Sequence, residues 1–142
     1  MNVKRLDDIA VGDSASHTAT VDAEAITAYA ALTGDHNPVH EDAGYAESTR
    51  FGRPVAHGLL VAGYVQTALT ELVAPGGVST RYAFDLVAPA YEGATVTAQA
   101  TCTALDRVTR RATFTITVVD DTTCTPLING SAVVAFAKGE NR

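Results

Sequence analysis

An uncharged segment in the middle of the chain constrains the fold most strongly. No Asp, Glu, Lys or Arg occurs from Pro54 to Thr70. From Gly58 to Val73, apolar side chains cover nearly every face of a helix, at Leu59, Leu60, Val61, Ala62, Tyr64, Val65, Ala68, Leu69, Leu72 and Val73. A helix that is apolar all round is normally buried, and this one is shorter than the roughly 20 apolar residues that cross a membrane. We therefore expect a buried helix over residues 58–73.

The second half of the chain changes to a two-residue period. Apolar residues and threonines alternate over 95–104 and again over 112–118, a pattern typical of strands that bury one face. The other elements predicted here are strands over 80–90 and 127–137, with turns at 106–110 and 120–125. Successive strands joined by short turns indicate an antiparallel sheet. A buried helix followed by such a sheet predicts an α+β fold in which the sheet wraps around the helix.

The N-terminal part predicts a short strand over 14–21 and then a helix over 22–33. Asp22 is a favourable first cap for this helix, and Gly34 is a typical residue at a helix end. A second, short helix over 41–48 is expected after an intervening loop.

Length and composition limit the class of protein. The 142 residues predict one domain covering 1–142. A net charge of −6 without a basic stripe argues against a nucleic-acid partner. The first eight residues lack the apolar core of a signal peptide. Cys102 and Cys124 form no CxxC pair, so we expect two reduced thiols in a cytoplasmic protein rather than a zinc or redox centre.

Residues 35–40, with the sequence Asp-His-Asn-Pro-Val-His, carry the first candidate chemistry. Asn37 precedes a proline, which disfavours the α conformation and predicts a shaped loop. A carboxylate at Asp35 and an imidazole at His40 on one rigid loop can converge on a water or a substrate proton. The same two residues would also suit a structural role, with Asp35 capping a turn and His40 bonded to the backbone.

The start of the buried helix, at His57-Gly58, provides the second candidate. The first N–H groups of a helix have no partner within it and attract anions. Gly58 has no side chain to keep a ligand away from these groups. The loop and the helix start together would supply an acid, a base and an oxyanion site. His36 is expected to be exposed and without a role.

Two segments together resemble the MaoC-like dehydratases, which include the (R)-specific enoyl-CoA hydratases. Residues 34–40 contain the D-x-N-P-x-H core, and residues 51–60, Phe-Gly-Arg-Pro-Val-Ala-His-Gly-Leu-Leu, contain R-P-x-x-H-G. The order of helices and strands also matches, so the resemblance extends over most of the chain. It implies a single hot-dog domain, in which an antiparallel sheet wraps around a long central helix, as the patterns above also predict.

The resemblance implies roles for five of these residues. Asp35 and His40 would be the catalytic pair that holds and activates one water. Asn37 would brace the loop, and His57 would support it rather than carry protons. The backbone amide of Gly58 would bind the thioester carbonyl.

Four further residues have two interpretations each. Gly63 stands six residues after His57, where hydratases of this family often carry serine, and would face either substrate or a packed strand. Tyr64 would line the path of the acyl chain or belong to the core. Arg50 and Arg53 would contact phosphates of CoA or of a carrier protein, or brace the loop. Other candidates for the path of the acyl chain are Val65, Tyr82, Phe84 and Leu86.

The resemblance implies a hydratase that adds water to a trans-2-enoyl thioester to give an (R)-3-hydroxyacyl thioester, or catalyses the reverse dehydration. The substrate would be an acyl-CoA or acyl carrier protein thioester, with no metal or other cofactor and no membrane partner, and the enzyme would be a homodimer. Two alternatives stay open: a hot-dog acyl thioesterase, and a non-catalytic subunit of a hetero-oligomeric dehydratase.

Overall fold

The computed structural model describes residues 2–138. Residue 1 and residues 139–142, which are the two ends of the predicted domain, lie outside the described residues. The elements are η1 (Leu6–Asp8), β1 (Ser14–Val21), α1 (Ala23–Thr33), α2 (Pro38–Glu41), α3 (Ala43–Glu47), α4 (Gly58–Val73), β2 (Val78–Leu86), β3 (Ala94–Asp106), β4 (Arg111–Asp120) and β5 (Thr125–Ala135).

Five strands form one antiparallel sheet in the order β1-β3-β4-β5-β2. The predicted alternation is confirmed in its centre, where Phe114, Ile116 and Val118 are fully buried and the intervening residues point away from the core. The pattern fails at Ala104, which is exposed. The pairing of β3 with β4 shifts between Cys102 and Ala104, and such a bulge turns the following side chains to the other face.

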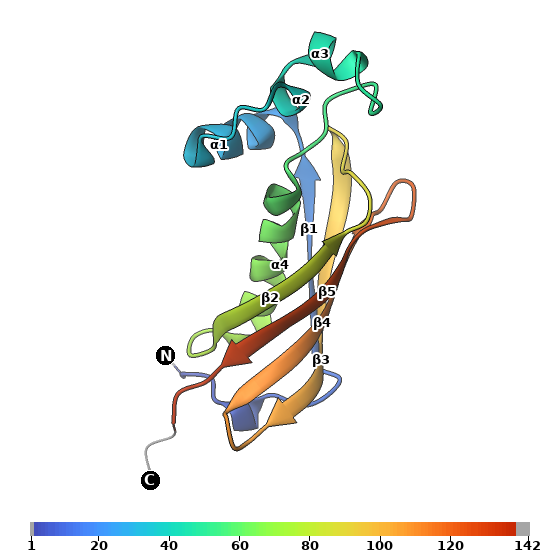
Figure 1. Cartoon of the computed structure of the whole chain (residues 1–142). Helices are drawn as coiled ribbons and strands as arrows, with labels where there is room; N and C mark the ends of the chain where they lie inside the picture. The colour runs from blue at the N-terminus through green and yellow to red at the C-terminus, as the bar shows by residue number, and fades with distance from the viewer. Residues whose placement is uncertain (1, 139–142) are drawn as a thin grey trace.

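The sheet curves around α4, as predicted (Figure 1). Six side chains of the helix are buried against the sheet: Val61, Ala62, Val65, Ala68, Leu69 and Val73. The helix is not covered all round, however, because Leu59 is 67% exposed and Gln66 and Thr67 are exposed on the same open side. No helix within residues 2–138 is long and apolar enough to cross a membrane.

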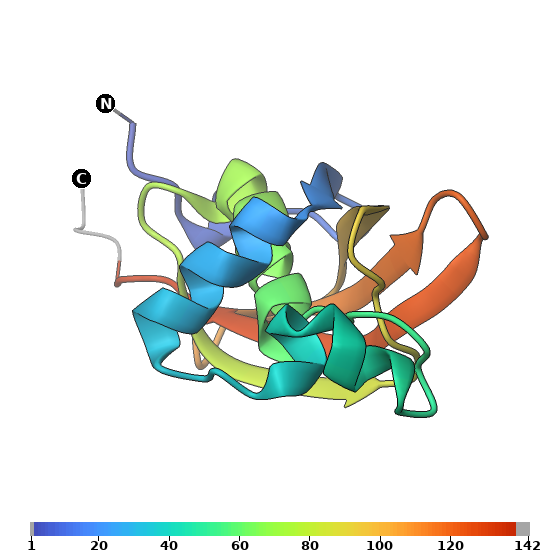
Figure 2. The same ribbon diagram turned by 90° about the horizontal axis from the view of Figure 1, so that it is seen from above.

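Three helices cross the end of the sheet above the start of α4 (Figure 2). The carboxylate of Asp22 accepts a hydrogen bond from the Ala25 amide at 2.8 Å, and Gly34 ends α1 in the left-handed conformation, so the predicted helix and both its caps are confirmed. The predicted short helix over 41–48 is confirmed as the shorter helix α3, whereas α2 was not predicted. The extended backbone of Asp42 separates the two helices, and its side chain caps α3.

The bounds of strands β2 and β5 differ from those predicted. β2 stops at Leu86 rather than at residue 90, since Pro89 has no N–H for a ladder and the amides of Val87 and Ala88 both approach one carbonyl, that of Leu127. β5 runs from Thr125 to Ala135, two residues earlier than predicted at each end.

Both cysteines are free, as the prediction of reduced thiols requires. Cys102 is buried beneath the sheet, and this burial raises the pKa of its thiol. Cys124 is exposed in the turn between β4 and β5.

A substitution at Gly130 tests the close packing of β5 against β2. A Cβ there would run into the carbonyl oxygen of Ala83 and lie 2.9 Å from the Cα of Phe84. Because the obstacle is backbone, Gly130→Ala is expected to lower the free energy of unfolding by about 1–3 kcal/mol, measured by urea denaturation.

The matched control adds the same methyl group to α4. At Gly63 a Cβ would approach only Nε2 of Gln66, at 4.0 Å, so Gly63→Ala is expected to be neutral or to stabilise by up to about 1 kcal/mol through helix propensity. Equal effects of the two substitutions would contradict the described contact between β5 and β2.

Candidate active site

The loop after α1 is shaped by its own side chains. One carboxylate oxygen of Asp35 accepts a hydrogen bond from the Asn37 amide at 3.1 Å. The side-chain oxygen of Asn37 in turn accepts from the Val39 amide at 3.2 Å and caps α2, which has Pro38 in its first turn. The geometry therefore supports a bracing role for Asn37. The second carboxylate oxygen of Asp35 has no hydrogen bond to any described residue.

His40 stands in the last turn of α2 and is half-buried. Its Nδ1 lies 2.6 Å from the carbonyl oxygen of Val55, and since a carbonyl can only accept, Nδ1–H is the donor. In the neutral imidazole this leaves Nε2 as an acceptor. No residue within 2–138 donates to that nitrogen. The two structural roles considered for Asp35 and His40 are thus both real, yet each side chain keeps one reactive atom free.

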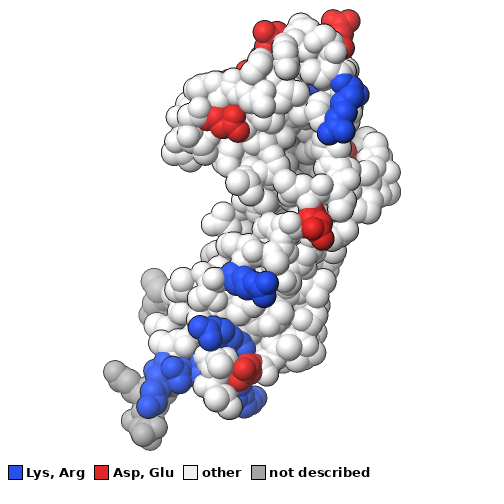
Figure 3. All heavy atoms as spheres, viewed as in Figure 1, with Lys and Arg blue, Asp and Glu red and all other residues white. Residues whose placement is uncertain are grey.

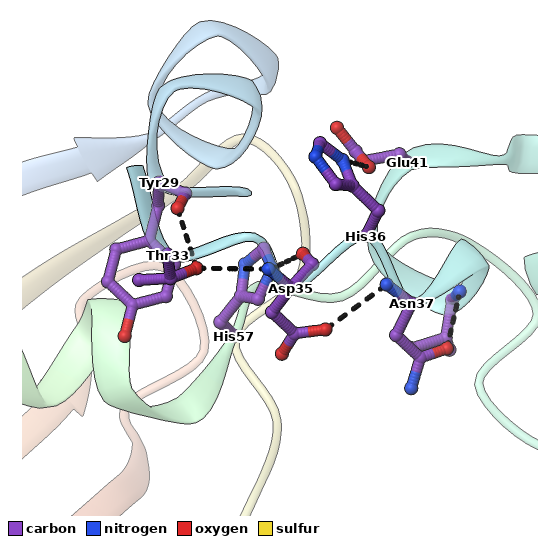
Figure 4. A network of polar contacts seen from close by, with 8 residues as sticks. Tyr29, Thr33, Asp35, His36, Asn37, Glu41 and His57 are labelled. Carbon is purple, nitrogen blue, oxygen red and sulfur yellow. Dashed lines mark hydrogen bonds and ion pairs between the residues drawn. The ribbon is translucent and has the colours of Figure 1, made fainter. Parts of the chain in front are cut away.

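His57 connects the loop to α4. It precedes the first helical residue and is only 3% exposed. Its Nε2 donates a hydrogen bond to the backbone carbonyl of Asp35 at 2.9 Å, a contact seen beneath the loop in Figure 4. Its ring stacks on that of His40, with centroids 3.8 Å apart, and packs against Tyr29 at 4.8 Å. Its Nδ1 is buried without a hydrogen-bond partner among the described residues.

The loop and the helix start bring three titratable side chains together. One carboxylate oxygen of Asp35, one ring nitrogen of His40 and one of His57 lie within 4.8 Å of one another. The two imidazole planes are only 28° apart and the rings are stacked with centroids 3.8 Å apart, so their in-plane lone pairs lie in separate, nearly parallel planes, which disfavours convergence on one ion. The arrangement suits acid–base chemistry on a shared water better than chelation of a metal.

The backbone amide of Gly58 is the first of the 16-residue helix α4. This amide donates no hydrogen bond to another described residue. The positive end of the helix dipole also lies at Gly58. The side chain of Leu86, at the end of β2, lies directly over this glycine, with Cδ1 2.6 Å from the position that a Cβ would take. Since the Gly58 N–H has no acceptor among the described residues, it is available to a carbonyl oxygen.

Two cavities meet at this point. The larger, of about 590 Å³, runs below the loop between α4 and the end of β2, and the smaller, of about 410 Å³, contains Asp35 and His57. His40, Gly58 and Leu86 line both. The surface is hollowed between the end formed by α1–α3 and the body of the sheet, and mainly uncharged atoms surround the hollow (Figure 3).

The structure does not bring Gly63 or Tyr64 to either cavity. A Cβ at Gly63 would meet nothing closer than Gln66 at 4.0 Å, so the expectation that this glycine makes room for a packed strand is wrong, and nothing among the described residues places it beside the cleft. The ring of Tyr64 packs against that of His17 in β1, with centroids 5.9 Å apart. Its partial burial, and the charge of Asp22, raise the pKa of its hydroxyl.

The two arginines of the segment before Gly58 differ in position. Arg50 lines the larger cavity and lies over the ring of Phe51, 4.7 Å from its centroid. Arg53 lines neither cavity and lies 4.1 Å from the centroid of Tyr91. The geometry favours a phosphate contact for Arg50 and loop bracing for Arg53.

His36 is exposed and pairs with Glu41 at 2.9 Å, pointing away from the carboxylate of Asp35 (Figure 4). Two participants were missed by the sequence analysis. The Val55 carbonyl, which fixes the tautomer of His40, is a backbone group without a sequence signal. Tyr29, which packs on His57, has the helical spacing of an ordinary core residue.

A sequence model of the MaoC like domain matches residues 10–123. An (R)-specific enoyl-CoA hydratase of Rhodospirillum rubrum is 37% identical over 133 residues, which cover 90% of this chain and 88% of the relative. A 3-hydroxybutyryl-CoA dehydratase of Methylorubrum extorquens is 30% identical over 143 residues, covering 99% of this chain and 88% of the relative.

Among solved structures, the (R)-hydratase of A. caviae involved in PHA biosynthesis superposes with a TM-score of 0.86 at 31% identity, covering 91% of this chain and 98% of that protein. These similarities confirm the predicted hot-dog fold. The match to the domain model over most of the sequence, together with relatives of similar length, shows that this chain belongs to the family of MaoC-like domain proteins.

Proposed function

We propose that this chain is an enzyme that adds water to a trans-2-enoyl-CoA to give an (R)-3-hydroxyacyl-CoA, and that it catalyses the reverse dehydration. The observation that carries the proposal is the meeting of Asp35, His40 and the Gly58 amide at one junction of two cavities. The activities of the relatives, a hydratase and a dehydratase of CoA thioesters, support the same reaction.

The negative charge that develops during the reaction would be stabilised at the start of α4. Attack of water at C3 of an enoyl thioester moves negative charge onto the thioester oxygen, which becomes an enolate oxygen. The amide of Gly58 and the dipole of α4 would meet this charge, and one such donor is worth about 3 kcal/mol of transition-state stabilisation in comparable sites.

The proton transfers belong to Asp35 and His40. The free carboxylate oxygen and the free Nε2 would hold one water between them, and the pair would take one proton from it as the C3–O bond forms. The same pair then delivers a proton to C2, so that the enzyme returns to its starting protonation state. The reaction causes no net change of oxidation state, because C3 is formally oxidised as C2 is reduced, and it therefore needs no redox cofactor. His57 would hold the Asp35 backbone in place rather than exchange protons.

CoA is the preferred thioester in this proposal because the relatives act on CoA thioesters. The guanidinium of Arg50 lines the larger cavity and suits a phosphate group of the thioester's carrier. An acyl carrier protein thioester presents a phosphate as well, and a comparison of rates with matched enoyl-CoA and enoyl-carrier substrates distinguishes the two. A cytoplasmic location and a single domain over the whole chain are part of the same proposal, as expected from the sequence.

We also propose a homodimer. β2 is an edge strand that pairs only with β5 within the described sheet. Two apolar residues of this strand, Val78 and Tyr82, are 67% and 42% exposed, and Leu59 on the open side of α4 is 67% exposed. A sheet edge with exposed apolar residues, beside an exposed leucine of α4, is prone to pair with another chain, and a second copy of this chain offers the complementary edge.

The catalytic pair is tested by Asp35→Asn and His40→Gln. Each variant is expected to lose about 10²- to 10⁴-fold in the rate of crotonyl-CoA hydration, followed by loss of the enoyl absorbance. The double variant should be little slower than the slower single one, because both residues act on one water.

The control for these variants is His36→Gln, which removes an exposed imidazole from the same loop. It should hydrate crotonyl-CoA at close to the wild-type rate. Near-normal turnover by Asp35→Asn or His40→Gln in folded protein would overturn the proposed mechanism.

The oxyanion site is tested by Gly58→Val. The branched side chain would displace Leu86 and block the approach of a carbonyl to the Gly58 amide, so turnover should fall by about 10²-fold or more. Gly63→Val, the same exchange in open space on the same helix, is the control and should retain activity. A folded, fully active Gly58→Val variant would show that the carbonyl binds elsewhere.

The thioesterase alternative predicts release of free thiol without prior loss of the double bond. Simultaneous measurement of thiol and enoyl absorbance with the purified wild-type chain separates the two reactions. The same assay tests the non-catalytic alternative, since the proposal requires activity from this chain alone.

The dimer is tested by light scattering after gel filtration. The wild-type protein should have twice the 14.8 kDa mass of one chain. Val78→Asp should shift it toward the monomer by placing a charge on the edge strand, whereas Val108→Asp, at an 88% exposed position in the turn between β3 and β4, should leave the mass unchanged. A wild-type monomer at micromolar concentration would contradict this part of the proposal.

A further inference from the structure

Leu86 has an unusual position for the last residue of an edge strand. Its side chain is 54% exposed, yet it lies over Gly58 closely enough that its Cδ1 would be 2.6 Å from a Cβ on that residue. The leucine therefore occupies the space that the missing side chain of the glycine leaves. It lies beside the helix start that carries the amide on which the proposed function depends.

The same side chain lies where the two cavities meet. The larger cavity continues from this junction toward the apolar walls of Val61 and Ile128, and the smaller one toward Asp35 and Leu59. A thioester whose carbonyl reaches the Gly58 amide, and whose C3 lies beside Asp35 and His40, must place C2 between them. Because Leu86 lines both cavities at this junction, we expect a group attached to C2 to lie against its side chain.

We propose that Leu86 determines substrate specificity at C2: its side chain fills the space beside the thioester carbonyl, so that the site favours enoyl thioesters with hydrogen at C2 and disfavours those with a C2 methyl branch. This inference rests on the proposed hydratase function and names the substrate class within it. The chemical basis is steric, because an apolar side chain competes with an apolar substituent for one volume.

The other groups at the junction cannot provide this selection. The imidazole of His40 is held by its bond to the Val55 carbonyl, and Gly58 contributes only backbone. Leu86 has no polar atom in its side chain and is the apolar side chain shared by both cavities. A change in its size alters the space at C2 without removing a hydrogen bond from the catalytic groups.

The test compares two probes, crotonyl-CoA and its 2-methyl derivative, tiglyl-CoA, in kcat/KM for hydration. Leu86→Ala should raise the ratio of tiglyl-CoA to crotonyl-CoA by about 10- to 200-fold, the range expected for one methyl or methylene group in an apolar pocket. Leu86→Phe should lower the same ratio. Because each ratio is measured within one protein, partial loss of active enzyme does not affect it.

Leu32→Ala provides the matched control. Leu32 is 84% exposed on α1 and lines neither cavity, so the ratio should stay at the wild-type value. If Leu86→Ala does not fold, Leu86→Val, which removes one methylene and retains a good strand former, should shift the ratio in the same direction.

An unchanged ratio in every folded Leu86 variant, with normal hydration of crotonyl-CoA by the wild-type protein, would overturn the inference and leave the proposed function intact. Absence of crotonyl-CoA hydration by the wild-type protein would overturn the proposed function and the inference with it. The two failures are therefore distinguished by one set of assays.

Discussion

The hydrogen bond from His57 to the backbone carbonyl of Asp35 is the contact on which the site depends. It joins the start of the loop after α1 to the residue that precedes α4, across 22 positions of sequence. Together with the hydrogen bonds between Val55 and residues 39–40, it fixes the distance between the carboxylate and the helix amide. Because His57 is buried and its ring stacks on His40, one side chain positions both members of the proposed catalytic pair.

The surroundings of this contact divide the chemistry between side chains and backbone. Charge on the thioester oxygen would be met by the amide of Gly58 and the dipole of a helix anchored in the core by residues such as Val65 and Leu69. Protons would be moved by Asp35 and His40. In each side chain, one polar atom is hydrogen-bonded to the backbone and the other has no partner among the described residues. A rigid helix start and a self-braced loop thus supply preorganised groups with little motion needed during reaction.

The sequence predicted those parts of the fold that depend on neighbouring residues. The α1 helix follows from Asp22 and Gly34, which act within one turn, and the central strands follow from their alternation. The bulge after Cys102 was missed because it depends on the facing strand. The residue types of the site were also predicted, whereas the tautomer of His40, set by a distant backbone carbonyl, could not be. The expectation of a strand packed on Gly63 failed because the surroundings of this residue depend on how α4 packs.

The most direct test of the account is identification of the product that the wild-type protein forms from crotonyl-CoA in ¹⁸O-labelled water. The account predicts (R)-3-hydroxybutyryl-CoA with the label in the C3 hydroxyl and no free CoA, because water between Asp35 and His40 attacks C3 while the thioester carbonyl stays bound at Gly58. Label in a released carboxylic acid together with free CoA, or formation of the (S) product, would contradict it.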